Sequence, residues 1–276
     1  MEFKKLGDIS IPLLGFGTFK LRGEECTNSV ITALETGYRL IDTAEAYGNE
    51  AEVGKAIKAS GIDRNELFIT TKVNFKSYEH TKDTVRSSLE KLGVDKLDLV
   101  LLHWGFGNYY KAWRELEELV DEGVIGAIGV SNFTPVQLID LVSFNRIKPL
   151  VNQTETNLYC QRINEHVWED KYNVAHEGYA PLGQGRANEM FAEPAVATLA
   201  RKYGKTPAQI LLRFFTQSDV IVIPKSAHPE RIRENFDIFD FSLSEAEIAE
   251  LRALDKASPM IGRSDKPEMV ESAMKW

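Results

Sequence analysis

Cysteine is nearly absent from this sequence. Only Cys26 and Cys160 occur in 276 residues, and neither belongs to a Cys-x-x-Cys motif or stands beside a pair of histidines. A disulfide framework and a zinc cage are therefore poor explanations of the fold. We expect two reduced thiols and no bound metal.

Long apolar runs and a surplus of positive charge are also missing. No stretch approaches the roughly 20 apolar residues of a membrane span, and the start MEFKKLGDISIPLLGFG lacks the basic-then-apolar pattern of a signal peptide. The net charge of -8 argues against a protein that holds nucleic-acid phosphates. We expect a cytoplasmic protein, a monomer or weak homo-oligomer, with neither membrane nor nucleic acid as partner.

No linker or low-complexity tract divides the chain, and a hydrophobic content of 43% suits a large core, so we expect one domain over residues 1–276. Eight short apolar runs alternate with amphipathic stretches. Most runs are continuous and rich in β-branched residues, as in strands that are buried on both faces. The runs are 13–17, 38–42, 67–72, 97–103, 125–131, 149–153, 174–180 and 220–224.

The stretches between the runs carry helix signals. Residues 26–37, 81–93 and 110–123 have apolar residues three and four apart and end in glycine. Helix starts are predicted at Thr134 and Thr206, each followed by proline and, three positions on, by the glutamine of a capping box.

This alternation predicts an α/β protein, a (β/α)8 TIM barrel. An open dinucleotide-binding sheet is less favoured, because residues 15–20 (GFGTFK) lack the third glycine of Gly-x-Gly-x-x-Gly. Residues 2–6 and 9–12 are predicted to pair across Gly7 and Asp8 as an N-terminal β-hairpin that closes the bottom of the barrel.

Polar or aromatic residues follow seven of the eight predicted strands. Each alone has an ordinary explanation, such as a helix cap or a solvated charge, but barrel active sites are built at the rim where these strands end. These residues are Asp42, Lys72, His103, Ser131, Asn132, Gln153, Tyr179 and Lys225.

Near this rim we predict a proton-donating group. Asp42 would hold Lys72, whose charge beside the Tyr47 hydroxyl would lower the tyrosine pKa from about 10. Tyr47 could then act as a general acid, with His103 beside it.

Seven segments resemble the aldo-keto reductase superfamily through nearly the whole chain: IDTAEAYGNEAEVGKAI, FITTKV, LVLLHW, GVSNF, VNQ, YAPLGQG and IPKSAHPERIRENF. The resemblance implies reduction of a small-molecule carbonyl with NADPH/NADP+ and a catalytic tetrad of Asp42, Tyr47, Lys72 and His103. For the cofactor it implies carboxamide contacts from Ser131, Asn132 and Gln153, stacking by Tyr179, a contact from Leu182, and an adenosine site of Lys225, Ser226, Arg231, Glu234 and Asn235.

The residues themselves support a phosphate site in the last segment. Pro229 suits the first turn of a helix, so Lys225 and Ser226 would precede the helix and Arg231 would lie in its first turn. An arginine fork and a lysine on one phosphate favour NADPH over NADH. The alternative is a surface basic cluster on an ordinary helix.

Aromatic residues supply the candidate substrate walls: Phe19, Phe75, Trp104 and Tyr109, with Lys20 nearby. They suggest a small aldehyde, a dicarbonyl or an aromatic carbonyl. Two departures from the family keep its specificity from being transferred. The loop 105–108 is short and lacks the proline that often follows in relatives, and Asn157 stands where many have histidine.

Two other functions stay open. A regulatory subunit could keep the barrel and NADPH with little catalysis. A glycosidase or isomerase would need paired rim carboxylates or a metal cluster. After the second predicted strand the nearby acids are Asp42 and Glu45, and the remaining histidines, which are His80, His166, His176 and His228, are scattered in the sequence.

Overall fold

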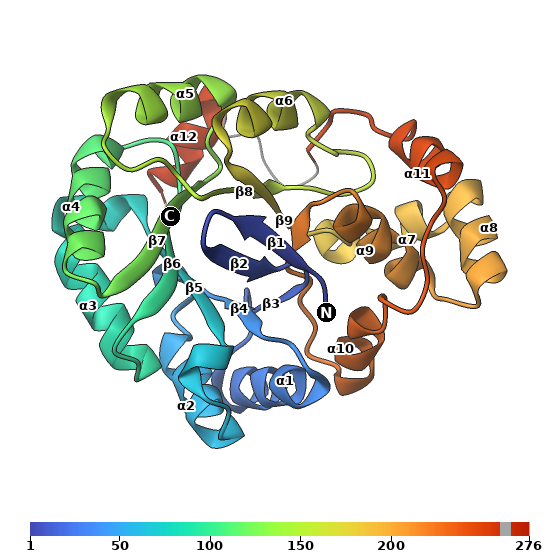
Figure 1. Cartoon of the computed structure of the whole chain (residues 1–276), viewed down its shortest axis with the longest axis horizontal. Helices are drawn as coiled ribbons and strands as arrows, with labels where there is room; N and C mark the ends of the chain where they lie inside the picture. The colour runs from blue at the N-terminus through green and yellow to red at the C-terminus, as the bar shows by residue number, and fades with distance from the viewer. Residues whose placement is uncertain (260–265, 276) are drawn as a thin grey trace.

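The structure is a computed structural model that describes residues 1–259 and 266–275. Eight parallel strands form one sheet in the order β10-β9-β8-β7-β6-β5-β4-β3. They are β3 Gly15–Gly17, β4 Leu40–Asp42, β5 Phe68–Val73, β6 Leu97–Leu102, β7 Ile125–Ser131, β8 Val151–Glu155, β9 Ala175–Tyr179 and β10 Ile221–Val222. A parallel bridge from Leu14 to Val222 joins the two ends of the sheet into a ring (Figure 1). The predicted barrel and its eight strands are confirmed.

The predicted hairpin is confirmed as well. Strands β1 Phe3–Leu6 and β2 Ile9–Pro12 pair antiparallel, and Gly7 adopts a φ of 60° in the turn between them. The hairpin lies across the middle of the ring (Figure 1). Its Leu6 and Ile11 pack against residues at the starts of the barrel strands, such as Val151, so the hairpin closes the amino-terminal end of the barrel.

Helices cover the outside of the ring (Figure 1). They are α1 Gly23–Thr36, α2 Glu50–Ser60, α3 Thr81–Leu92, α4 Tyr109–Asp121, α5 Pro135–Phe144, α6 Ile163–Tyr172, α7 Ala187–Phe191, α8 Pro194–Tyr203, α9 Pro207–Gln217, α10 Pro229–Phe236, α11 Glu245–Arg252 and α12 Pro267–Ala273. Short 3-10 helices are η1 Glu45–Tyr47, η2 Arg64–Glu66, η3 Phe75–His80 and η4 Gly183–Gly185.

The predicted helix signals are confirmed. The stretches 26–37, 81–93 and 110–123 correspond to α1, α3 and α4, and both capping boxes form, from Thr134 to Gln137 and from Thr206 to Gln209. Each box satisfies N–H groups that the first turn of a helix leaves without partners. Both cysteines are free and buried, and burial raises the pKa of Cys26 to about 12 and of Cys160 to about 11.

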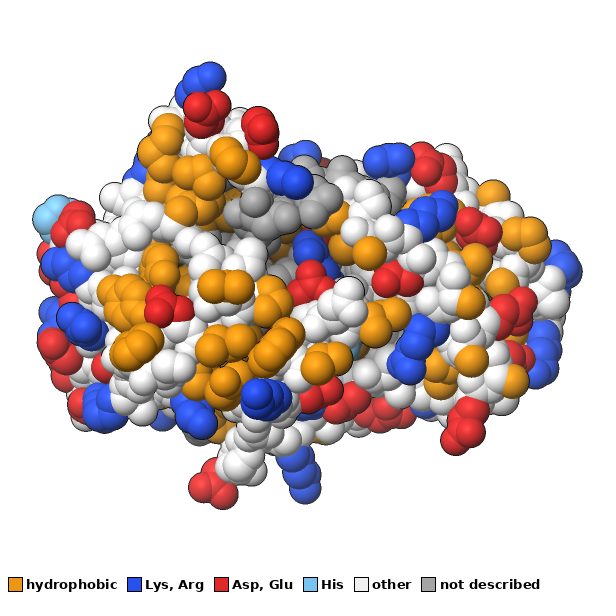
Figure 2. All heavy atoms as spheres, turned by 90° about the horizontal axis from the view of Figure 1, so that it is seen from above, with side chains coloured by type: hydrophobic (Ala, Val, Ile, Leu, Met, Phe, Trp, Pro, Cys, Tyr) orange, Lys and Arg blue, Asp and Glu red, His pale blue; other side chains and the backbone are white. Residues whose placement is uncertain are grey.

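One helix face departs from the usual pattern. Figure 2 shows hydrophobic side chains gathered over the α5 and α6 face, where Val136, Phe144, Ile163 and Val167 are exposed. On α6 the apolar residues therefore point to solvent, whereas Glu169 of the same helix is buried.

Helix α2 can approach α3 closely because position 54 is glycine. A Cβ at Gly54 would lie 2.6 Å from the carbonyl oxygen of Leu92, which is backbone and cannot move aside. In an ordinary helix Gly→Ala stabilises by about 1 kcal/mol. Here Gly54→Ala should instead lower the free energy of unfolding by about 1–3 kcal/mol in a denaturant titration, because overpacking outweighs helix propensity. Lys58→Ala, an exposed change in the same helix, is the control and should shift stability by less than about 0.5 kcal/mol.

Candidate active site

The barrel brings Asp42, Tyr47, Lys72 and His103 together at the carboxyl-terminal rim. Asp42 ends β4, Lys72 lies near the end of β5, His103 follows β6, and η1 carries Tyr47 back over the rim. The Lys72 ammonium lies 2.6 and 2.7 Å from the two Asp42 carboxylate oxygens and 2.9 Å from the carbonyl oxygen of Thr43. The same ammonium lies 5.1 Å from the centre of the Tyr47 ring, whose centre is 5.8 Å from that of His103.

Burial and charge set the protonation of this group. Burial alone would lower the pKa of Lys72, but Asp42 and, to a lesser extent, Tyr47 and Glu177 together outweigh burial and raise this pKa, so Lys72 stays a cation. Burial, with help from the Lys72 charge, lowers the pKa of His103 to about 3. His103 is therefore a neutral imidazole at physiological pH, able to donate one hydrogen bond.

The predicted lowering of the Tyr47 pKa is wrong. Burial raises it, and the nearby Lys72 cation offsets only part of that rise. A phenol beside one cation in a buried site still loses more from desolvation than it gains from the charge. Tyr47 therefore keeps its proton in this structure and has it available to donate.

A buried acid that the sequence reading missed adjoins the group. The Gln153 side-chain amide donates to Asp42 Oδ2 at 2.8 Å and to Glu177 Oε1 at 3.1 Å. Burial, followed by repulsion from Asp42, raises the pKa of Glu177 to about 8. The alternation of side chains along a strand could have predicted Glu177 as a site residue. It stands two residues before Tyr179 on β9, so both side chains lie on the same face of the strand.

Replacing Glu177 by glutamine should make stability less dependent on pH. Its folded pKa of about 8 lies above the ordinary 4.5, so the folded protein holds the extra proton. Stability is then lost as pH rises from about 4.5 towards about 8. Glu177→Gln removes this loss, so its Tm relative to the wild type should climb between about pH 5 and about pH 8. A constant Tm difference would contradict a buried, protonated Glu177, and exposed Glu90→Gln is the control.

The residues expected at the nicotinamide form a connected belt. Asn132, with a left-handed φ of 60°, donates from Nδ2 to the His103 carbonyl at 3.1 Å and accepts at Oδ1 from the Tyr179 hydroxyl at 2.9 Å. The Ser131 hydroxyl donates to the Gln153 carbonyl at 2.9 Å. Hydrogen bonds thus fix the belt between the ends of β7, β8 and β9.

Three of the residues expected at the adenosine end, Lys225, Ser226 and Arg231, lie around the start of α10. Among the residues that the structure describes, no side chain caps this helix, and the Ser226 hydroxyl accepts a hydrogen bond from the His228 N–H at 3.0 Å. Lys225 and Arg231 are exposed. Neither forms an ion pair with any residue in ranges 1–259 and 266–275.

The expected cofactor site has three further residues, two in the last turn of α10 and one beside η4. Glu234 accepts a hydrogen bond from the Thr206 hydroxyl at 2.9 Å, which ties α10 to the start of α9. Asn235 is buried, and Leu182 is half-buried beside η4.

Aromatic rings line the approach to Tyr47 and His103. Phe19 packs on Tyr47 at 5.0 Å between centroids, and Trp104 stacks on His103 at 5.9 Å. Phe106, which the sequence reading missed, bridges Phe75 at 4.9 Å and Trp104 at 5.5 Å. The sequence feature that could have predicted Phe106 is an aromatic residue within the short loop 105–108.

Tyr109, a candidate for the substrate wall, and Asn157, a departure from the family's usual residue, both contact other parts of the fold. Tyr109 packs on Phe133 at 5.3 Å, and its hydroxyl points to Asp140 of α5, which places it in the packing between α4 and α5. Asn157, found in place of the family's histidine, donates to Glu155 at 2.9 Å and holds the Tyr159 N–H at 3.1 Å.

An eight-stranded barrel with a buried lysine–carboxylate pair, a tyrosine and a histidine at its carboxyl-terminal rim defines a class of oxidoreductase. Residues 13–256 match the Aldo/keto reductase family, and the protein belongs to this family. Methylglyoxal reductase DkgA of Escherichia coli is 41% identical over 256 residues, which are 91% of this chain and 93% of that protein. An aldo-keto reductase of Mycolicibacterium vanbaalenii is also 41% identical, over 91% of each chain.

Solved structures agree with the sequence relatives. An aldo-keto reductase from a Medee basin deep-sea metagenome library superimposes with a TM-score of 0.93 at 40% identity, covering 96% of this chain and 98% of that one. The Bombyx mori aldo-keto reductase in complex with NADP has a TM-score of 0.89 at 33% identity, covering 95% of each. Within the described residues, no helix is long and apolar enough to cross a membrane.

Proposed function

We propose that this protein reduces aldehydes or ketones to alcohols with NADPH, using Tyr47 as the general acid. The observation that carries the proposal is the buried Lys72 ammonium, clamped by Asp42 at 2.6 and 2.7 Å beside a tyrosine that keeps its proton. A reductase that converts a carbonyl oxygen to an alcohol needs such a donor, since the oxygen gains negative charge as the reaction proceeds.

Each residue of the tetrad has a separate task. NADPH, when bound, supplies the hydride that is added to the carbonyl carbon. Tyr47 donates its hydroxyl proton to the carbonyl oxygen, and the Lys72 cation stabilises the phenolate that is left behind. Asp42 keeps Lys72 charged and in place. His103, neutral at physiological pH, donates a hydrogen bond that orients the carbonyl oxygen.

The chain offers a fitting site for NADPH. The start of α10 has no side-chain cap, so its N–H groups are available to an anion, and Lys225 and Arg231 stand there without ion pairs among the described residues. A 2′-phosphate would satisfy both features. At the other end Tyr179, anchored by Asn132, offers its ring to the nicotinamide.

Small aldehydes and dicarbonyls are the proposed substrates. The aromatic rings of Phe19, Phe75, Trp104 and Phe106 provide apolar walls near Tyr47 and His103. The ammonium of exposed Lys20 lies 5.3 Å from the centre of the Phe19 ring at the edge of these walls. The Escherichia coli relative is a methylglyoxal reductase, and methylglyoxal is a small dicarbonyl, which supports this proposal.

A carbonyl panel tests this function. We expect loss of the reduced-nicotinamide absorbance with methylglyoxal and aromatic aldehydes, and much slower loss with NADH at the same concentration. A protein that binds NADPH but turns over no carbonyl in the panel would instead support the regulatory alternative.

A further inference from the structure

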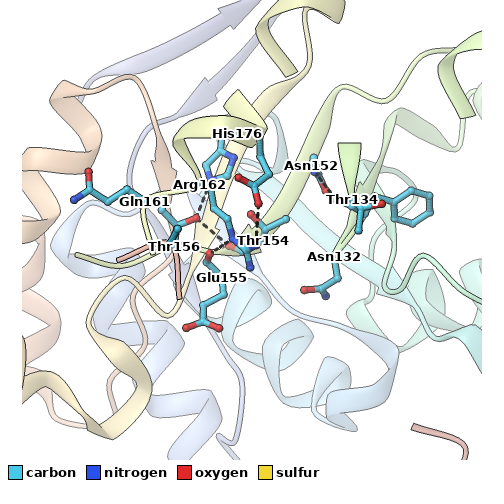
Figure 3. A network of polar contacts seen from close by, with 12 residues as sticks. Asn132, Thr134, Asn152, Thr154, Glu155, Thr156, Gln161, Arg162 and His176 are labelled. Atoms are coloured by element: carbon cyan, nitrogen blue, oxygen red, sulfur yellow. Dashed lines mark hydrogen bonds and ion pairs between the residues drawn. The ribbon is translucent and has the colours of Figure 1, made fainter. Parts of the chain in front are cut away.

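The layer between α6 and the barrel is polar, where a barrel normally packs apolar side chains. Asn152 and Thr154 of β8, Thr156 just after it and His176 of β9 face outwards in this layer (Figure 3). Glu169 of α6 lies buried against them. Helix α6 exposes Ile163, Val167 and Trp168 to solvent and therefore turns polar side chains towards the barrel. Burying polar side chains costs free energy unless hydrogen bonds or a bound ion satisfy them.

His166, Glu169 and His176 meet in the centre of this layer. Glu169 Oε2 lies 2.7 Å from His176 Nδ1, and the two histidine rings are 4.1 Å apart between centroids. One ligand atom from each of the three residues lies within 4.8 Å of the other two. The expectation that the histidines are scattered is therefore wrong for this pair, because β9 follows α6 directly and folds back along it.

One nitrogen in the cluster has no partner. His166 Nε2 is buried, and no hydrogen bond reaches it from the described residues. A buried polar atom without a partner costs about 1–3 kcal/mol, so its presence calls for an explanation. His176 and Glu169, by contrast, each have a hydrogen-bond partner on the barrel. Thr156 Oγ1 lies 2.7 Å from His176 Nε2, and Asn152 Nδ2 donates to Glu169 Oε1 at 2.8 Å.

We propose that His166 Nε2, Glu169 Oε2 and His176 Nδ1 bind a divalent transition-metal ion, with Zn²⁺ the best match. Two imidazoles and one carboxylate are a donor set that zinc accepts, and the remaining coordination is left to water on the partly exposed side of His166. Thr156 orients His176 and Asn152 orients Glu169 by hydrogen bonds, as residues that contact metal ligands commonly do.

Binding requires the cluster to rearrange. Zinc bonds of about 2.0–2.2 Å place neighbouring ligand atoms about 3.4 Å apart. Glu169 Oε2 and His176 Nδ1, which are 2.7 Å apart, therefore have to separate, while the outer limit of 4.8 Å for the whole cluster has to shorten. His166 can turn inwards because no hydrogen bond holds its Nε2, and the ion takes the place of the proton between His176 and Glu169. The ion would join α6 to β9. Its three ligands, His166, Glu169 and His176, belong neither to the tetrad nor to the expected cofactor site, so the proposal does not depend on the proposed reaction.

Cobalt titration of the chelator-treated full-length protein tests the site. Co²⁺ should bind with a stoichiometry of one and give the intense visible bands of a four-coordinate ion, and Zn²⁺ should displace it. Zinc at about a hundred times its dissociation constant should raise Tm by about 5 °C or more, reversibly with chelator. Absence of the bands at one equivalent, with no Tm shift, overturns the proposal without any variant.

Two variants separate this site from metal binding to surface histidines. His166→Gln removes the partly exposed ligand and should weaken Zn²⁺ at least tenfold, as measured by competition with a chromophoric chelator. His80→Gln removes an exposed histidine at the start of α3 and should leave the zinc affinity unchanged. Equal zinc affinity in wild type and His166→Gln, or equal loss in both variants, would refute the assignment.

Discussion

Tyr47→Phe should lower kcat by at least about 10²–10⁴, the contribution of general acid catalysis. The substitution removes the hydroxyl beside Lys72 and leaves the ring in place against Phe19 and His103. The dissociation constant of NADPH should change little, because the belt of Ser131, Asn132 and Tyr179 does not rest on that hydroxyl. Steady-state rates with methylglyoxal and fluorescence titration of the cofactor measure the two quantities.

Tyr110→Phe is the matched control for this experiment. Its hydroxyl donates to Asp140 at 2.6 Å, outside the tetrad, so its removal should cost stability of about 1 kcal/mol and leave kcat unchanged. Near wild-type turnover in Tyr47→Phe would remove the tyrosine from its proposed role, whatever the other variants show.

Arg231→Ala should weaken NADPH about ten- to a hundredfold and leave NADH almost unchanged. A charge-assisted hydrogen bond to the 2′-phosphate contributes roughly 1.5–3 kcal/mol, and NADH carries a hydroxyl at that place. The preference for NADPH should therefore shrink or invert. The dissociation constant of each cofactor is measured by fluorescence titration at one fixed salt concentration, because exposed phosphate contacts are screened by salt.

Arg233→Ala is the control on the same helix. Arg233 is exposed and lies in the last turn of α10, away from the uncapped end. It should change neither dissociation constant by more than about twofold if it acts only as a screened surface charge. If Arg231→Ala weakens NADPH and NADH equally, or if the wild type binds both cofactors with the same affinity, Arg231 does not hold a 2′-phosphate.

The sequence was sufficient for the architecture because the signals of a parallel barrel are local. Most of the strands form continuous apolar runs because both of their faces are buried, and Asp42 and Lys72 stand at or near the carboxyl ends of such runs. Strands β8 and β9 are more polar. Since every strand of a parallel barrel ends on the same rim, strand order predicted that Asp42, Lys72 and His103 lie together. Tyr47 follows no strand directly, and the resemblance to the family named it as the fourth member.

The features that the sequence did not predict depend on how deeply a side chain is buried and on how helices pack against strands. Local sequence does not reveal that burial outweighs the Lys72 charge at Tyr47, because desolvation is a property of the assembled site. Glu177 was overlooked although strand alternation places it on the same face as Tyr179, since a fully buried glutamate contradicts the usual preference of that residue for the surface. The meeting of His166 with His176 required the docking of α6 on β9.

Isotope transfer tests the central claim most directly. NADPH carrying deuterium at both C4 positions is incubated with the wild-type protein and methylglyoxal or an aromatic aldehyde, and the alcohol is analysed by mass spectrometry. The account predicts one deuterium in the product, bonded to the former carbonyl carbon, and little product in Tyr47→Phe. Alcohol without deuterium, or NADPH binding with no alcohol from any carbonyl tried, would contradict it.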